Sequence, residues 1–241
     1  MGLLLNLYLG HLIGDFVLQP GWLVAAKRRG APGVLLHGAV IGICTAFILY
    51  ADLVELIDVV LLATAAHLAI ELATIRLRSG TYASGLSVFI IDQVLHLVTL
   101  VLLVRLVSPW AEVESLRTLG YELGPITLAT LCAFIAVSFM GSIVVMEVVN
   151  VWGPDSARTE ILSYDVARVY GMIERGSALV LSLLVHPVLM LAPFVPRVAW
   201  AFISRPRTRS SETLTAATGL VIAALGWAFV VGVALAVEAG A

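Results

Sequence analysis

Apolar residues in this chain come in runs long enough to cross a lipid bilayer, rather than in the stripes of a soluble domain. A run of roughly 18 or more apolar residues is typical of a transmembrane helix. Asp, Glu, Lys and Arg make up 12% of the 241 residues, whereas a soluble domain carries about twice that share. No polar segment is long enough for a separate soluble domain, so we expect the chain to act within or beside the bilayer.

Seven membrane spans are predicted from the positions of these runs. They are residues 3–26, 34–50, 54–75, 86–107, 126–149, 170–193 and 214–237. The first is expected to bend or end near Pro20. The apolar stretch 194–204 is too short to cross alone and is predicted to be the return arm of a re-entrant hairpin or an interfacial helix. The expected fold is an all-α polytopic helical bundle, a single membrane domain over 1–241, with a four-helix part at 1–107 and the remaining helices at 124–238.

The charges of the loops predict their sidedness, because Lys and Arg favour cytoplasmic loops. The loops at 27–29 and 76–78 are basic, while those at 52–58 and 112–122 are mainly acidic. We therefore expect the N-terminus outside and the two basic loops in the cytoplasm. The basic loop at 205–209 joins them only if the preceding stretch turns back. A net charge of −2 gives no electrostatic reason to expect nucleic acid as a partner.

Histidine–carboxylate pairs are concentrated in the first four predicted spans. Four of the five histidines lie before residue 100, and three of them are four positions from a carboxylate. Residues four apart share one face of a helix, so each pair presents an imidazole and a carboxylate to the same side. The pairs are His11/Asp15, His67/Glu71 and Asp92/His96; His37 is the fourth histidine, and Gln19 and Gln93 neighbour the first and third pairs.

The two later pairs are placed at matching depths. At a rise of about 1.5 Å per residue, Glu71 and Asp92 lie roughly 8 Å from the cytoplasmic ends of their helices. By the same count His67 and His96 lie roughly 14 Å deep, level with Asp15. The motif order is reversed between the two helices, as antiparallel neighbours require if like groups are to meet. Ionisable groups so deep in a membrane are costly and usually mark function.

A divalent metal site is the hypothesis that explains the whole set. Neutral imidazole with carboxylate oxygen suits Zn²⁺, Mn²⁺ or Fe²⁺. The candidates outnumber the four ligands of one zinc site, so we expect two ions, or one ion with supporting residues around its ligands. The predicted ligands are His11, Asp15, His37, His67, Glu71, Asp92 and His96, supported by Gln19 and Gln93. The alternatives are a hydrogen-bond network that joins the helices and a proton relay.

A second polar group follows later in the chain. It comprises Glu147, Asn150, Asp165, Arg168, Glu174 and Arg175. Glu174 and Arg175 fall in the first turns of the sixth predicted span, where anchoring at the membrane interface would explain them. The sharper hypothesis is that Arg175 orients an anionic group of a substrate above the metal. His186, which stands alone beside Pro187, is expected to be structural.

Several of these motifs resemble a bacterial inner-membrane family called domain of unknown function 3307. They are His11-Leu-Ile-Gly-Asp15-Phe-Val-Leu-Gln19, Lys27, His37, His67, Asp92-Gln93-Val-Leu-His96 and Tyr170-Gly-Met-Ile-Glu174-Arg175. The resemblance spans roughly 5–205 and implies a bacterial inner-membrane location, but no activity. The family favours Asp where this chain has Glu71 and Lys where it has Arg76. More weakly, the opening His-x-x-x-Asp motif is similar to multi-pass membrane-bound metal-dependent hydrolases.

Three functions fit this pattern. The first is a metal-dependent hydrolase that takes a lipid or lipid-linked substrate from the cytoplasmic side, with Asp15 as general base and Arg175 near the mouth of the site. The second is a divalent-metal transporter, which would need polar residues continuing to the outer face, where the predicted spans are nearly wholly apolar. The third is a structural or partner-binding membrane subunit, which the small residues of the later spans allow. The sequence favours the hydrolase.

Overall fold

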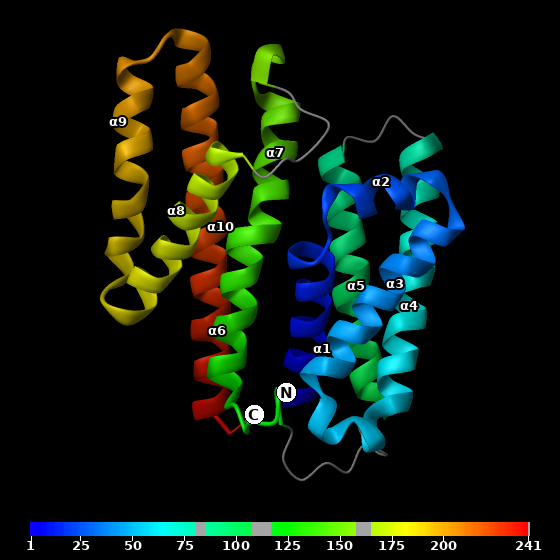
Figure 1. Ribbon diagram of the computed structural model, residues 1–241. Coiled ribbons are helices and arrows are strands. Elements are labelled where there is room, and N and C mark those ends of the chain that lie inside the picture. The colour runs from blue at the N-terminus through cyan, green and yellow to red at the C-terminus, as the bar shows by residue number, and fades with distance from the viewer. Residues whose placement is uncertain (81–84, 108–116, 158–164, 241) are drawn as a thin grey trace. The chain divides into compact units, whose positions relative to one another are not determined.

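The computed structural model describes residues 1–80, 85–107, 117–157 and 165–240 (Figure 1). Within these ranges every regular element is a helix, apart from one isolated β-bridge between Thr118 and Tyr121. The prediction of an all-α helical bundle is confirmed. The chain divides into two compact units, Met1–Cys132 and Ala133–Ala241, which are described in turn.

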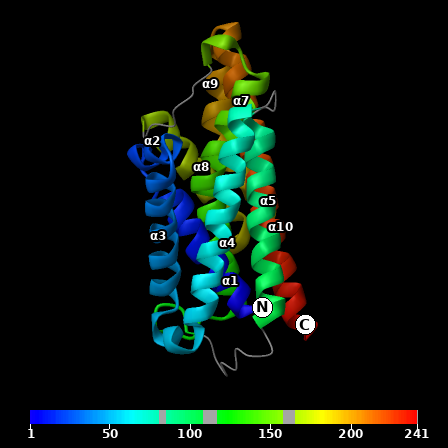
Figure 2. The ribbon, with the colours of Figure 1, turned by 90° about the vertical axis from the view of Figure 1, so that its right-hand side faces the viewer.

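The first unit is built around four long helical segments. In chain order its elements are α1 (Gly2–Leu12), the π-helix η1 (Ile13–Val17), α2 (Gly21–Arg29), α3 (Ala31–Ile48), the short 3₁₀ helix η2 (Tyr50–Asp52), α4 (Leu53–Gly80) and α5 (Gly85–Val107). Helix α1 packs against both α3 and α5, α3 packs against α4, and α4 packs against α5 (Figures 1 and 2). The four segments therefore surround a common interior.

Five helices of the described residues are long and apolar enough to cross a membrane. They are Ala31–Ile48, Tyr50–Arg76, Gly85–Val107, Pro125–Trp152 and Thr208–Glu238, and a sixth is added if the bent pair Gly2–Val17 and Gly21–Arg29 counts as one span. The fourth of these contains α6 (Pro125–Ile135), a π-helical turn η3 (Ala136–Met140) and α7 (Gly141–Trp152). The chain is thus a multi-pass membrane protein, and five or six of the seven predicted spans are found among the described residues by length and composition.

The bend expected near Pro20 in the first predicted span is present. Its helix stops at Val17, and α2 leaves at an angle of 93° to it. Pro20 precedes α2 in an extended conformation, with ψ 159°, and it has no backbone N–H with which to continue the helix. Helix α2 buries Leu23 and exposes Trp22. A short helix with this pattern is typical of one lying along a membrane surface.

Small residues bring α1 and α3 close together. A Cβ atom added to Gly10 would lie 2.9 Å from the Cα atom of Thr45, and one added to Gly14 would lie 3.1 Å from the Cα atom of Ile41. Glycines four residues apart are a common means of close helix approach in membranes. This approach allows side chains on the same stretch of α1 and η1 to reach those of α3.

Arg117 and Thr118, which precede α6, bond to the end of the first unit remote from α2. The Arg117 guanidinium donates to Asp52 Oδ1 from Nε at 3.0 Å and from Nη2 at 2.6 Å, and this bonding raises the pKa of Arg117 above its usual value. Thr118 Oγ1 donates to Asn6 Oδ1 at 2.6 Å. The predicted acidic loop residues Glu112 and Glu114 lie outside the described residues.

The second unit contains a helical hairpin packed on one long helix. Its elements after α7 are η4 (Asp155–Ala157), α8 (Val166–Leu184), η5 (Pro187–Phe194), α9 (Val195–Ile203) and α10 (Pro206–Glu238). Helices α8 and α9 run in opposite directions (Figure 1), and both pack against α10. A single span over 170–193 is therefore wrong, because α8 ends at Leu184 before Pro187. The return arm expected at 194–204 coincides with α9.

We predict that Gly10→Ala destabilises the first unit by about 1–3 kcal/mol, the usual cost of overpacking, because the new Cβ atom meets the backbone Cα atom of Thr45 as well as its side chain. Gly232→Ala is the matched control, since a Cβ there meets nothing within 4 Å. Thermal unfolding in detergent measures both variants. Equal midpoints for the two would contradict the close approach.

Candidate metal centre

The predicted ligands face the interior of the first unit from four elements. His11 lies in α1, Asp15 in η1, His37 in α3, His67 and Glu71 in α4, and Asp92 and His96 in α5. All but Asp92 are buried, each with less than 9% of its surface exposed. Chain segments more than 80 residues apart in sequence thus meet at one place inside the bundle.

One set of four side chains is arranged as metal ligands are. Asp15, His37, His67 and Glu71 offer ligand atoms that all lie within 4.8 Å of one another. His37 Nε2 is at the centre, 3.0 Å from Asp15 Oδ1, 3.1 Å from His67 Nε2 and 3.9 Å from Glu71 Oε2. Two ligands of a tetrahedral Zn²⁺ lie about 3.3 Å apart, given bonds of about 2.0–2.2 Å. We call this set the carboxylate group; its spacing suits one divalent ion.

A π-helical turn holds Asp15 in this arrangement. The backbone N–H of Leu18 donates to the carbonyl of Ile13 at 2.8 Å, a bond five residues back that widens the helix. Gln19 follows this turn, and its Nε2 lies 3.2 Å from Asp15 Oδ1 and 3.2 Å from His37 Nδ1. Gln19 therefore touches two members of the carboxylate group, as expected of a supporting residue.

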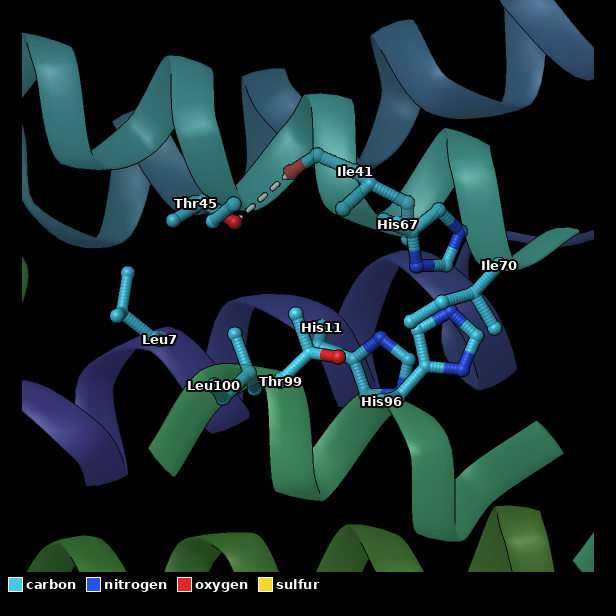
Figure 3. Close-up of a pocket in the computed structure, with 10 residues that line it drawn as sticks. Leu7, His11, Ile41, Thr45, His67, Ile70, His96, Thr99 and Leu100 are labelled. Carbon is cyan, nitrogen blue, oxygen red and sulfur yellow. Dashed lines mark hydrogen bonds between the residues drawn. The ribbon is translucent and has the colours of Figure 1, made fainter. Parts of the chain in front are cut away.

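A second set consists of three histidines. His11, His67 and His96 offer ring nitrogens that lie within 4.8 Å of one another. The rings point toward a shared cavity of about 20 Å³, which is lined otherwise by Leu7, Ile41, Thr45, Ala63, Ile70, Thr99 and Leu100 (Figure 3). We call this set the histidine group. His67 belongs to both groups, so the two are adjacent.

Asp92 stands outside both groups, although it was predicted as a ligand. Its carboxylate accepts from Thr74 Oγ1 at 2.9 Å and from Gln93 Nε2 at 2.9 Å. Its backbone carbonyl accepts from His96 Nδ1 at 2.8 Å. Gln93 also reaches the first helix, with Oε1 3.4 Å from His11 Nε2. Asp92 and Gln93 therefore orient histidines, and Thr74 joins them without any signal in the sequence.

Lys27 is a site residue that sequence reasoning assigned to loop charge alone. Its Nζ lies 3.0 Å from Glu71 Oε1, and the two side chains are only 11% and 10% exposed. The right-angled turn after Pro20 directs α2 across the end of the bundle and places this ammonium over α4. The sequence predicts a bend near Pro20 but not its angle of 93°, and the contact of Lys27 with Glu71 depends on that angle.

The electrostatics of the carboxylate group favour an added cation. Glu71 is paired with Lys27, whereas the contacts of Asp15 within 4 Å are with Gln19 and histidine rings. A buried carboxylate requires compensation by a positive charge or by several hydrogen bonds. Two further buried atoms, His67 Nδ1 and His96 Nε2, have no hydrogen-bond partner. A hydrogen-bond network alone leaves these nitrogens unexplained, whereas metal ions would use them.

Arg175, predicted to orient a substrate, is bonded to its own unit. It lies in the second unit and is 2% exposed. Its Nε donates to the carbonyl of Val137 at 2.7 Å, and its Nη2 donates to the carbonyl of Ser138 at 2.9 Å and to Ser142 Oγ at 2.7 Å. These carbonyls belong to the π-helical turn η3, whose irregular hydrogen bonding leaves acceptors for a side chain. We therefore do not retain Arg175 as a catalytic candidate.

The neighbouring charges of the second unit are also paired internally. Glu174 accepts from Arg197 Nε at 2.8 Å, and Arg197 Nη1 donates to Glu212 at 2.5 Å. Glu174 is 4% exposed, and this ion pair accounts for its burial. His186 accepts from the backbone N–H of Val188 at 3.3 Å and caps η5, which is the structural role expected of it.

Comparison with known families matches residues 3–119 to a family described as "Protein of unknown function (DUF3307)". The match confirms the resemblance seen in the His11–Gln19 and Asp92–His96 motifs, and it includes every predicted metal ligand. It ends before the Tyr170–Arg175 motif. No curated protein and no solved structure matches the chain.

We predict that added Zn²⁺ raises the thermal midpoint of the detergent-purified protein, because an ion that binds only the folded state stabilises that state. At an ion concentration of 100 Kd the free energy of unfolding increases by about 2.7 kcal/mol. Asp15→Asn and Glu71→Gln should each lose most of this shift. Asp52→Asn should keep it, since Asp52 is an equally buried carboxylate of the same unit that is bound by Arg117. A wild-type midpoint indifferent to Zn²⁺, Mn²⁺ and Fe²⁺ would exclude the metal centre.

Proposed function

We propose that this chain, whose residues 3–119 belong to the DUF3307 family, is a metal-dependent hydrolase of the bacterial inner membrane that acts on a lipid or lipid-linked substrate from the cytoplasmic side. The carboxylate group carries the proposal. Four buried ligand side chains within 4.8 Å of one another, inside helices that are apolar outside, suit metal chemistry beside a bilayer.

The surroundings of the site support a lipid as substrate. The outward faces of α4 and α5 expose large apolar side chains, among them Leu61 and Leu62 on α4 and Val98 and Leu102 on α5. Such a surface is in contact with lipid when the helices span a membrane. A substrate that stays in the bilayer can therefore bring its polar head group to the end of the unit that α2 covers.

The residues of the carboxylate group have different proposed roles in the hydrolysis. An ion held by them would polarise the scissile ester or phosphoryl group and lower the pKa of an attacking water. Asp15 is the proposed general base, holding the proton of that water on its carboxylate. His37, whose Nε2 lies 3.0 Å from Asp15 Oδ1, would remain a ligand of the ion. Gln19 fixes the orientation of both side chains.

Lys27 takes the place proposed earlier for Arg175. Its ammonium is partly buried against Glu71 and lies on a helix with Trp22 exposed, beside the exposed Arg28 and Arg29. A cation in this position attracts a phosphate or other anionic head group at the membrane surface. Lys27 is therefore the proposed group that orients the anionic part of the substrate.

The far side of the centre supports a hydrolase rather than a transporter. Beyond the histidines the cavity wall is mainly apolar, formed by Leu7, Ile41 and Leu100. Farther along α1, Asn6 is fully buried and bonded to Thr118. Within the described part of this unit, the carboxylate at that end, Asp52, is held by Arg117. A chain of available ligands across the membrane, which metal transport needs, is not provided by these residues.

We predict that α2 faces the cytoplasm, as the basic residues of 27–29 favour. Arg28→Cys should resist an impermeant thiol reagent in intact cells and react after lysis. Asp58→Cys, on an exposed position after η2, should react in intact cells. The native cysteines, Cys44 and Cys132, are buried and serve as an internal blank. Labelling of Arg28→Cys in intact cells would reverse the proposed side of substrate entry.

We predict that the purified protein in lipid vesicles hydrolyses generic phosphomonoester or phosphodiester lipids in a metal-dependent reaction. Loss of a general base typically costs about 10²–10⁴-fold, so Asp15→Ala should lose turnover by that order. Asp52→Asn should retain it. Lys27→Met should raise the KM for anionic substrates. Metal flux across the vesicle membrane without any turnover would favour the transporter instead.

A further inference from the structure

His67 is shared by the two ligand groups, and its ring nitrogens face different neighbours. Its Nε2 lies 3.1 Å from His37 Nε2, on the side of the carboxylate group. Its Nδ1 is buried and has no hydrogen-bond partner. The residue is 4% exposed, so water from outside does not satisfy that nitrogen. One ring is thus engaged on one side and unsatisfied on the other.

His96 presents a second unsatisfied nitrogen to the same space. Its Nδ1 lies 2.8 Å from the backbone carbonyl oxygen of Asp92, and a carbonyl oxygen only accepts hydrogen bonds. The ring proton of neutral His96 must therefore be on Nδ1, which leaves a lone pair on Nε2. This Nε2 is buried without a partner. A backbone bond that fixes the tautomer in this way is characteristic of metal-ligating histidines.

The cavity between these rings has room for one small occupant. Its volume is about 20 Å³, and one water-sized occupant needs roughly 10–15 Å³. His11 completes the wall, with its ring centroid 5.4 Å from that of His67 and 4.7 Å from that of His96 (Figure 3). Three histidines beside an open position form the ligand set of a catalytic zinc site.

We infer that the centre binds two metal ions, the second in the histidine group of His11, His67 and His96, with the His67 imidazole bridging it to the ion of the carboxylate group. The ion of the carboxylate group is part of the proposed function, and the inference rests on that function for this ion alone. For both nitrogens of His67 to bind, the ring releases its N–H proton to solvent, and the resulting anionic ring lies between two cations. A site made only of imidazole nitrogens suits Zn²⁺ or Cu²⁺, while the carboxylate group also suits Mn²⁺ and Fe²⁺.

The test is the zinc content of the full-length protein, purified in detergent, loaded with Zn²⁺ and freed of excess ion. Wild-type protein should hold two equivalents. His96→Gln and His11→Gln should each hold one, and His67→Ala should lose most of both. Thr99→Val is the matched control, because Thr99 lines the same cavity without offering a nitrogen, and it should hold two. The single ion kept by His96→Gln also reports that the variant is folded.

The bridge itself is tested with Cu²⁺, whose unpaired electrons couple through a shared imidazole. The electron paramagnetic resonance signal of doubly loaded wild-type protein should account for far fewer spins than copper ions. His96→Gln should give one uncoupled spin. Two uncoupled spins in wild-type protein would overturn the bridge.

Wild-type protein could instead hold a single zinc that His96→Gln keeps and Asp15→Asn loses. That result would overturn the second metal site and leave the proposed function standing, and the cavity would then hold a water. No zinc in wild-type protein would overturn both.

Discussion

The burial of Asp15 is the constraint on which the site depends. This carboxylate sits among helices that face lipid, and its neighbours are Gln19 and the rings of His11 and His37. A charge in such a place is stable only with a compensating cation or a dense set of donors. Glu71, a few ångströms away, already has Lys27. The proposed ion would supply a positive charge in direct contact with Asp15, and the histidines would supply its remaining bonds.

The backbone makes that burial possible in two ways. Gly10 and Gly14 let α1 approach α3 so closely that a methyl group would meet backbone atoms, which brings Asp15 within reach of His37. The π-helical turn after α1 and the break at Pro20 then redirect the chain by 93°, so that α2 covers the end of the bundle and Lys27 reaches Glu71. The first thirty residues therefore provide a ligand, a supporting amide and a cation from one interrupted helix.

The second unit uses its charges differently. Arg175 satisfies carbonyl groups released by the π-helical turn η3, and Arg197 joins Glu174 of α8 to Glu212 of α10. Every one of these groups that is buried has a partner within the unit. They hold the α8–α9 hairpin against α10 and leave no side chain of this network unpaired for a substrate. The chemistry proposed for the protein accordingly rests on the first unit.

Composition and spacing were enough to establish the class of fold and the residue types of the site. Long apolar runs admit little but membrane helices, and a spacing of four places His11 with Asp15 and His67 with Glu71 on single helix faces. The reversed order in Asp92 and His96 correctly indicated antiparallel neighbours. Helical periodicity carries no information on which helices touch, on how sharply a helix turns, or on which nitrogen of a histidine ring remains free. The tertiary structure decided these three points. Asp92 became a supporting residue because its backbone carbonyl accepts a hydrogen bond from His96 Nδ1, and Lys27 joined the site because a bend at Pro20 changed the direction of α2. Contacts of this kind depend on the relative positions of whole helices, which a local sequence pattern does not specify.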